Sequence, residues 1–368
     1  MKILSVITSL RTGGAERLVI DLTKRFRQAG EKAEILLFDG TRTPMVEEAE
    51  AAGIPVHSLG KGAGEMHDPF MFLRLGRFLK EHDYDIVHTH NTPCQMAAAI
   101  APARSRLVTT EHNTSNRRRS WRCFLPVDRW MYGKYDAIVC VSKETETALI
   151  NYLVKPALST RISFIPNGID LKRFSPESLP ESKPDPRFCT ILMVSAFRPE
   201  KDQLTLIRAI SELPENFRLL LAGGAEIDEG RRMLEECRRA VTELGLERRV
   251  SFLGIRDDIP ELIASSDILV LSTRHEGLSL SMLEGMASGK PFVASNVDGV
   301  REAVGDACIL FEQGDYHELS GILSKLYYFC EFYEQTGRRC RALAGVFDID
   351  VTACRYLSMY GNILNSNK

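Results

Sequence analysis

The pattern that decides the fold is DILVLSTRHEGLSLSMLEGMASGKPFVAS, residues 267–295. A continuous apolar run at 267–273 predicts a buried strand, which is followed by a helix over about 279–289 and a second strand over 291–295. Strand, turn, helix and strand in this order form a βαβ unit, in which the two strands lie parallel in one sheet. Glu276 lies in the predicted turn, and Glu284 lies about one and a half turns inside the predicted helix.

The start of this helix is a candidate anion site. The backbone amides of Gly277, Leu278 and Ser279 are expected at the positive end of the helix, where a phosphate or a pyrophosphate binds well. A rise of five residues, roughly 7–8 Å, separates that end from Glu284, which is about the distance from the phosphates of a nucleotide to its ribose hydroxyls. Glu276 can therefore meet a sugar while Glu284 meets a ribose; the alternative is that both are solvated turn and helix residues.

Alternating strands and helices predict two Rossmann-like domains. The strands expected in the first half are 3–8, 34–38, 55–59, 85–90, 107–112 and 137–142. The stretch 166–186 is rich in Pro, Ser and charge and has no periodicity, so it is predicted to be a linker. The strands expected after it are 190–197, 218–222, 250–254, 267–273 and 291–295. The alternative to two domains is one large doubly wound sheet. In open parallel sheets of either kind, ligands bind beyond the carboxyl ends of the strands.

The composition excludes several classes of protein. A chain of 368 residues suits two domains of ordinary size, and a net charge of −2 does not indicate a nucleic-acid partner. No apolar run has the length of a membrane span, and MKILSVITSL lacks the pattern of a signal peptide, so a cytoplasmic location is expected. The nine cysteines form no C-x-x-C pair and are expected to be reduced, buried thiols rather than zinc ligands or disulfides.

The spacing of Glu276 and Glu284, followed by GKPFVASNVDGVREAVGD at 289–306, resembles the E-x7-E signature of the retaining GT-B glycosyltransferases of family 4. The resemblance covers nearly the whole chain and implies an α/β GT-B fold, with two Rossmann-like parallel-sheet domains facing a cleft. It further implies an acceptor-side domain at 1–168 and a domain that binds the nucleotide-sugar donor at 169–349. A C-terminal helix at 350–368 would pack back on the first domain.

The same resemblance assigns site residues in the first half of the chain. LRTGGAER at 10–17 is similar to a family loop whose second glycine, here Gly14, lies near the donor diphosphate; a structural tight turn is the alternative. His112 ends the predicted strand of LVTTEHN and matches a family histidine near the reacting sugar. His88 is interpreted as a scaffold residue, and the role of His90 is left open.

In the second half, Lys201 matches a family lysine that binds the donor diphosphate. The family usually has an arginine where this chain has Ala196, so Arg198 either reaches the same phosphates from a shifted position or is a solvated loop residue. The residues expected to be catalytic are His112 and Glu276. The residues expected to bind the donor are Gly14, Arg198, Lys201, Gly277, Leu278, Ser279 and Glu284.

No metal and no other cofactor is expected. The D-x-D sequences at 83–85 and 348–350 are interpreted as boundary residues, because neither falls on a loop of the predicted site. Lys201, Arg198 and helix ends would stabilise the leaving diphosphate instead. The expected activity is metal-independent transfer of a hexose or an N-acetylhexosamine from a nucleoside diphosphate sugar to a hydroxyl of a glycan or a lipid-linked saccharide, as in surface polysaccharide biosynthesis. The alternatives are a non-hydrolysing sugar-nucleotide epimerase and a non-catalytic sugar-nucleotide-binding protein.

Residues 116–135 combine basic and aromatic side chains. The arginines are Arg117, Arg118, Arg119 and Arg122, and the apolar residues among them are Trp121, Phe124, Leu125 and Trp130. Such a segment suits the anionic surface of a membrane or a lipid-phosphate acceptor, which would make the protein peripheral at the inner face of the membrane. A solvated amphipathic helix is the alternative.

Overall fold

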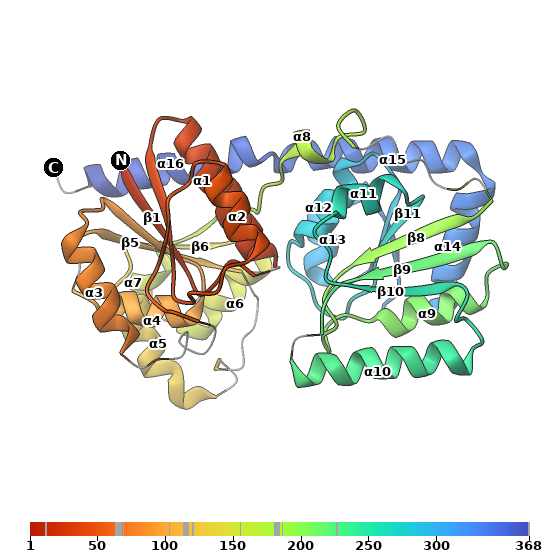
Figure 1. Ribbon diagram of the computed structural model, residues 1–368, viewed down its shortest axis with the longest axis horizontal. Coiled ribbons are helices and arrows are strands. Elements are labelled where there is room, and N and C mark those ends of the chain that lie inside the picture. Colours follow the sequence, from red (N-terminus) through yellow and green to blue (C-terminus); the bar gives the residue numbers. More distant parts are fainter. Residues whose placement is uncertain are drawn as a thin grey trace. The chain divides into compact units, whose positions relative to one another are not determined.

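The computed structural model describes residues 1–11, 13–62, 68, 70–102, 104–112, 118–119, 121–154, 156–179, 185, 187–225 and 227–366. The chain divides into two compact units (Figure 1). Unit 1 contains Met1–Gly168 together with Ile349–Lys368, and unit 2 contains Ile169–Asp348. Each unit is built on its own parallel sheet, as the alternation of strands and helices predicts.

Seven strands form the sheet of the described part of unit 1, in the order β3-β2-β1-β4-β5-β6-β7. They are β1 Lys2–Ile7, β2 Lys32–Leu37, β3 Val56–Ser58, β4 Ile86–Thr89, β5 Arg106–Glu111, β6 Ala137–Cys140 and β7 Ile162–Phe164. All neighbouring strands pair in parallel. The central strands are buried along their length, which is why they appear in the sequence as continuous apolar runs.

The helices of unit 1 connect successive strands. They are α1 Gly14–Gln28, α2 Pro44–Ala51, α3 Met71–Glu81, α4 Thr92–Ile100, the 3-10 turn η2 Arg122–Phe124, α5 Leu125–Tyr132, α6 Lys143–Leu153, α7 Pro156–Ser159 and, from the end of the chain, α16 Ile349–Asn365. α1 buries Leu18, Val19, Leu22 and Phe26 on one side, and the chain leaves it through Gly30, whose φ of +89° is a left-handed conformation that suits glycine.

The last helix, α16, packs against the first, α1. Arg25 of α1 forms an ion pair with Asp350 of α16. The ring of Phe26 meets the rings of Tyr356 and Tyr360 edge to face, with centroids 6.5 and 5.8 Å apart. Both tyrosines are buried, so the end of the chain completes the core of unit 1.

Six strands form the sheet of unit 2 in its described part, in the order β10-β9-β8-β11-β12-β13. They are β8 Cys189–Val194, β9 Phe217–Ala222, β10 Val250–Gly254, β11 Ile268–Leu271, β12 Phe292–Ser295 and β13 Ile309–Phe311. The helices are α8 Leu171–Phe174, α9 Gln203–Ser211, α10 Asp228–Glu243, α11 Ile259–Ala264, α12 Leu280–Ala287, α13 Asp298–Val304, α14 Tyr316–Tyr328, α15 Cys330–Ala344 and the 3-10 turn η3 Gly345–Phe347. In Figure 1, α9 and α10 lie below the sheet of this unit and α11 and α12 lie above it.

Three details differ from the sequence predictions. The edge strands β7 and β13 were not predicted, although β3, an edge strand of the same length, was predicted at 55–59. The expected linker is only partly a linker: α8 falls within it, buries Phe174 and packs against α12. The cysteines are all free, as expected, but Cys123, Cys330 and Cys354 are exposed rather than buried.

Across the part of the chain that the structure describes, no helix is both long enough and apolar enough to cross a bilayer.

Candidate functional site

The groups predicted to bind the donor lie where the strand order of unit 2 reverses. β8 pairs with β9 on one side and with β11 on the other, so the loops that follow β8 and β11 leave the sheet next to each other. Arg198 and Lys201 are in the first loop and Glu276 is in the second. This is the position at which open parallel sheets bind their ligands.

Hydrogen bonds join these two loops. Lys201 forms an antiparallel bridge with Thr273 just beyond β11. The carbonyl of Glu200 accepts from the Thr273 hydroxyl at 2.9 Å and from the amide of Arg274 at 2.8 Å. The backbone that carries Lys201 is therefore held against the backbone that leads to Glu276.

Lys201 and Glu276 form an ion pair. The Lys201 Nζ donates to Oε2 of Glu276, and the two side chains are 17% and 18% exposed. Burial lowers the pKa of Lys201 to about 8; the charge of Arg198 acts in the same direction and that of Glu200 opposes it. Two residues that are 75 positions apart thus present a cation and a carboxylate at one point.

The turn after Glu276 leads into α12. The helix begins one residue later than predicted, so Ser279 is its N-cap and not its first residue. Gly277 and Leu278 belong to the turn, and the Leu278 side chain is buried. The predicted anion seat therefore comprises the end of the turn and the first turn of α12, whose amides lack intrahelical acceptors.

Glu284 lies in the second turn of α12 and is partly exposed. The next residue, Gly285, faces the sheet, because a Cβ there would lie 2.6 Å from a ring carbon of Phe292 in β12. A glycine at this position lets α12 pack closely on β12. The depth of the helix, and with it the position of Glu284, depends on that contact.

The loop after β8 carries Ala196 at the position of the expected arginine. The Ala196 carbonyl accepts from the side-chain amide of Gln203 at 3.2 Å. Arg198 is exposed, and its carbonyl accepts from the amide of Lys201 at 2.9 Å. Arg198 thus shares a turn with Lys201, and its role in binding phosphate stays a prediction.

The predicted residues of unit 1 lie at the carboxyl edge of the other sheet. The strand order reverses there between β1 and β4. Gly14 is the first residue of α1, which follows β1, and is exposed. His112 comes directly after β5 and is partly buried.

His112 belongs to a cluster of three histidines. Its Nε2 lies 3.3 Å from Nδ1 of His90, and the ring of His90 lies 4.1 Å from the ring of His88, centroid to centroid. Burial lowers the pKa of His88 to about 3 and that of His112 to about 4, and it lowers the pKa of His90 well below its usual value. The cluster is therefore neutral at ordinary pH.

Comparisons with known proteins identify the family to which the chain belongs. The family model for Glycosyltransferase Family 4 matches residues 12–173, and the model for Glycosyl transferases group 1 matches residues 189–328. The chain belongs to glycosyltransferase family 4. This confirms the predicted family, a retaining glycosyltransferase that takes its sugar from a nucleoside diphosphate sugar.

Individual relatives agree with this membership. A UDP-Gal:alpha-D-GlcNAc-diphosphoundecaprenol alpha-1,3-galactosyltransferase from Escherichia coli is 28% identical over 262 residues, which cover 66% of each chain. A phosphatidyl-myo-inositol mannosyltransferase from Mycobacterium leprae is 26% identical over 328 residues, 85% of this chain and 83% of the relative. The crystal structure of HepE from Anabaena with UDP-glucose is 25% identical, superposes with a TM-score of 0.84, and covers 98% of this chain and 100% of its own. The predicted GT-B fold is confirmed.

A buried ion pair next to His112, between Glu111 and Arg119, was not predicted from the sequence. Arg119 donates to Oε2 of Glu111 at 2.6 Å and to the hydroxyl of Tyr132 at 2.9 Å, and that hydroxyl donates to Oε1 of Glu111 at 2.6 Å. The Arg119 and Glu111 side chains are 7% and 8% exposed. The available signal was a glutamate that follows four uncharged residues at the end of a predicted strand, where burial requires a partner.

This pair and its neighbour correct the prediction of a basic surface at 117–122 for two of its four arginines, Arg118 and Arg119. Arg119 points inward, and Nε of Arg118 lies 2.9 Å from Oδ1 of the fully buried Asp128. Both arginines are used to neutralise buried carboxylates, so neither is available to an anionic surface. Arg117 and the side chain of Arg122 lie outside the described residues.

The aromatic part of the same segment faces solvent. Trp121, Phe124, Val127 and Trp130 are exposed by 61, 40, 43 and 45%. Trp121 directly precedes η2, and the other three lie in η2 and α5. Nζ of Lys134 lies 5.8 Å from the ring centre of Trp130. We call these four residues the apolar strip.

The two D-x-D sequences lie at the starts of a strand and of a helix. Asp85 directly precedes β4, and its side chain accepts from the amide of Lys2 at 2.7 Å. Asp348 and Asp350 flank the start of α16. Within the described ranges, no group of three or more His, Cys, Asp or Glu side chains is arranged to hold a metal ion.

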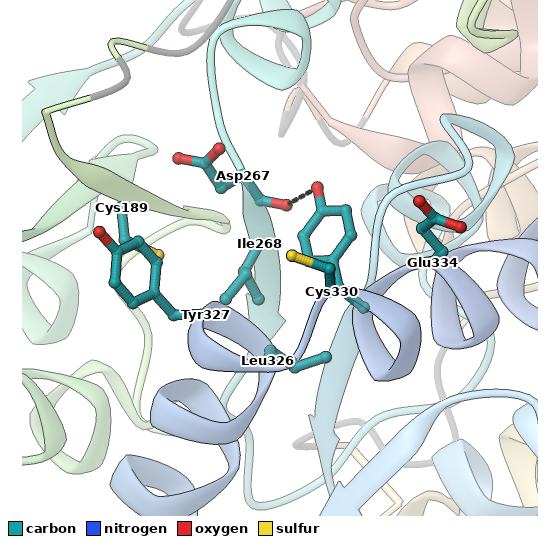
Figure 2. Close-up of a pocket in the computed structure, with 8 residues that line it drawn as sticks. Cys189, Asp267, Ile268, Leu326, Tyr327, Cys330 and Glu334 are labelled. Atoms are coloured by element: carbon teal, nitrogen blue, oxygen red, sulfur yellow. Dashed lines mark hydrogen bonds between the residues drawn. The ribbon is translucent and has the colours of Figure 1, made fainter.

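A pocket of about 310 Å³ in unit 2 lies at the opposite end of its strands (Figure 2). Cys189, Asp267 and Ile268, at or just before the starts of β8 and β11, line it together with residues of α14 and α15. Tyr333 of α15, which also lines the pocket, donates to the carbonyl of Asp267 at 2.8 Å. Lys201 and Glu276 follow the other ends of β8 and β11, so this pocket is not part of the predicted donor site.

Proposed function

We propose that this family 4 enzyme transfers a hexose or an N-acetylhexosamine to a hydroxyl of a glycan or a lipid-linked saccharide. The observation that carries the proposal is the ion pair of Lys201 and Glu276 at the strand reversal of unit 2. A cation and a carboxylate at one point match the two halves of a sugar nucleotide, because the diphosphate is anionic and the sugar offers hydroxyl donors.

The proposed roles follow from this match. Lys201, assisted by Arg198 and the start of α12, stabilises the negative charge that grows on the diphosphate as the bond between it and the sugar breaks. Glu276 accepts hydrogen bonds from the donor sugar, and Glu284 accepts them from the ribose. Gly14 lies near the diphosphate, and His112 forms a hydrogen bond with the reacting sugar.

Retention of configuration constrains the chemical step. The acceptor oxygen forms its bond to the anomeric carbon on the face from which the diphosphate leaves. The bonding electrons go to the leaving phosphate oxygen, which then takes the proton of the acceptor hydroxyl. The enzyme thus has to hold the diphosphate close to the sugar after the bond breaks, which is the task assigned to Lys201.

A uridine diphosphate hexose is the first donor to test. HepE from Anabaena was crystallised with UDP-glucose, and the relative from Escherichia coli is named for transfer from UDP-Gal to a diphosphoundecaprenol-linked sugar. The mannosyltransferase relative is named for a phosphatidyl-inositol acceptor. These names support a sugar nucleotide as donor and a lipid-linked acceptor as the kind of acceptor to try.

Thermal unfolding with a panel of nucleotide sugars tests the donor proposal. A ligand present at 100 times its Kd stabilises the folded state by about 2.7 kcal/mol, which raises the Tm of a domain of this size by several degrees. The matching nucleotide sugar should also be hydrolysed slowly or transferred when acceptors are supplied. If no member of the panel raises the Tm and none is consumed, the proposal is wrong.

We also propose that unit 1 associates peripherally with the inner face of a membrane through the apolar strip. Tryptophan side chains favour the interface between lipid and water, and a row of exposed apolar residues is uncommon on a surface that faces only solvent. In this proposal the apolar strip takes the place of Arg118 and Arg119, since both are paired inside the protein. A lipid-linked acceptor would then be reached at the membrane surface.

A further inference from the structure

His90 is the histidine to which the proposed mechanism gives no task. It follows β4 directly, and 3% of its surface is exposed. Its Nδ1 lies 3.3 Å from Nε2 of His112, and the two ring centres are 5.5 Å apart. His90 is thus the neighbour that meets His112 through a ring nitrogen.

His90 is itself held by a fixed ring. His88 is fully buried, and both of its ring nitrogens are engaged: Nε2 lies 2.8 Å from the Thr110 hydroxyl and Nδ1 lies 2.6 Å from the Tyr360 hydroxyl. The hydroxyl of Thr110 also lies 3.0 Å from that of Tyr356. The ring of His90 lies on this anchored imidazole, so it has little freedom to rotate.

The contact between His90 and His112 joins two neutral imidazoles. One nitrogen of the pair must carry the proton and the other must accept it. When Nε2 of His112 is fixed as donor or acceptor by His90, its Nδ1 takes the opposite role. The partner of one ring nitrogen therefore decides what the other nitrogen can offer to a ligand.

We propose that His90 is a positioning residue that fixes the ring orientation and the tautomer of His112 for its hydrogen bond with the donor sugar. The inference rests on the proposed function, because it assumes that His112 meets the donor sugar. His88 and the tyrosines of α16 act one step further back, by holding His90.

Three substitutions of His90 separate a positioning role from simple packing. In His90→Asn, the side-chain amide places a polar atom at the position of Nδ1, because both lie one bond beyond Cγ. In His90→Gln, the polar atoms lie one bond further out, and in His90→Leu there is none. The readouts are kcat, the KM for the nucleotide sugar, and the Kd for the free nucleoside diphosphate, which has no sugar for His112 to contact.

We expect His90→Leu and His90→Gln to lower kcat by about 10- to 100-fold, as displaced active-site groups do. His90→Asn should recover most of that loss. The Kd for the free nucleoside diphosphate should change less than about twofold in all three variants, whereas loss of fold would weaken it. His57→Leu is the matched control, since His57 contacts Glu34 on another part of the sheet and should retain full kcat.

A double-mutant cycle with His112→Ala completes the test. If His90 acts through His112, adding His90→Leu to His112→Ala should lower kcat by less than about twofold. Independent, multiplying effects overturn the inference, and so does an Asn variant no better than Leu. If His112→Ala keeps its activity, the proposed role of His112 fails together with the inference; if it loses activity while His90→Leu does not, the inference alone fails.

Discussion

The carboxyl edges of the two sheets differ in charge although both follow the same plan of parallel strands and connecting helices. In unit 2, the groups at the strand reversal are an ionised lysine and a carboxylate, both partly open to solvent. In unit 1, the groups at the ends of the neighbouring strands β4 and β5 are three imidazoles that burial keeps neutral. A charged edge offers ion pairs and charge-assisted hydrogen bonds, whereas a neutral edge offers hydrogen bonds between uncharged groups. The two sheets thus place their strand ends alike, and the side chains at those ends decide which kind of interaction each unit offers.

Among the changes that test this comparison, Glu276→Gln should have the largest effect on the rate of transfer, because it removes the negative charge of the ion pair in unit 2. Transfer should fall about 1000-fold or more, as for the loss of a strong transition-state contact. The affinity for the free nucleoside diphosphate should be kept or increased, since Lys201 is released from its carboxylate. Product formation at saturating donor and isothermal titration calorimetry measure the two quantities.

The control for this variant is Glu302→Gln, which changes an exposed carboxylate of α13 in the same unit. Turnover close to that of the unaltered enzyme for Glu276→Gln, at saturating donor, would remove Glu276 from the mechanism.

The pH dependence of nucleotide binding tests the role of Lys201, the other partner of this ion pair. Burial lowers the pKa of Lys201 to about 8, so the ammonium loses its proton above that pH and not near its usual value of 10.5. Binding of the nucleoside diphosphate requires the charged form, so affinity should be constant below about pH 8 and fall by up to tenfold per pH unit above it. Lys201→Arg should abolish the bend, because arginine stays charged. A bend that persists in the arginine variant would show that another group causes it.

Substitutions of exposed aromatic residues in unit 1 should weaken binding to vesicles, by a smaller factor than the loss of transfer expected above, whereas a substitution of this kind in unit 2 should not. Replacing Trp121 and Trp130 with serine should weaken binding to acidic vesicles by about tenfold for each residue that enters the interface, which corresponds to about 1.4 kcal/mol. Salt should have little effect, because the contact is apolar. Tyr328→Ser, which alters an exposed aromatic residue of unit 2, should leave co-sedimentation unchanged. Equal pelleting of the double variant and the unaltered enzyme would favour a solvated helix.

The smallest effect is expected from chelation. If Lys201, Arg198 and the start of α12 carry the charge of the leaving diphosphate, EDTA should change the rate of transfer by less than about twofold. A complete loss of rate that manganese or magnesium restores would show that a metal ion performs this task.

The framework of both units could be predicted because it depends on local patterns. Buried parallel strands appear as short apolar runs, and the helices between them have their own period. The same patterns place Glu276 in a turn and Glu284 in a helix. The edge strands β7 and β13 were missed, and each of them pairs with a single neighbouring strand.

The pairings of side chains could not be predicted, because they depend on which strands become neighbours. Lys201 meets Glu276 only because β8 pairs with β11, and His90 meets His112 only because β4 pairs with β5. The direction of Arg119 is decided by a buried glutamate, and without that carboxylate the residue reads as part of a basic surface. Sequence spacing finds candidates, and strand order decides which of them touch.

The return of α16 to unit 1 sets an order of events during synthesis. One of the two hydrogen-bond partners of His88, Tyr360, is translated only after all of unit 2, whereas the other, Thr110, precedes it. Because domains begin to fold as they leave the ribosome, the sheet of unit 1 has to wait with an open flank while the second unit is made. A nascent chain interrupted before α16 would have its strands but not its anchored histidines. The complete hydrogen bonding of His88 thus requires residues that follow unit 2 in the sequence.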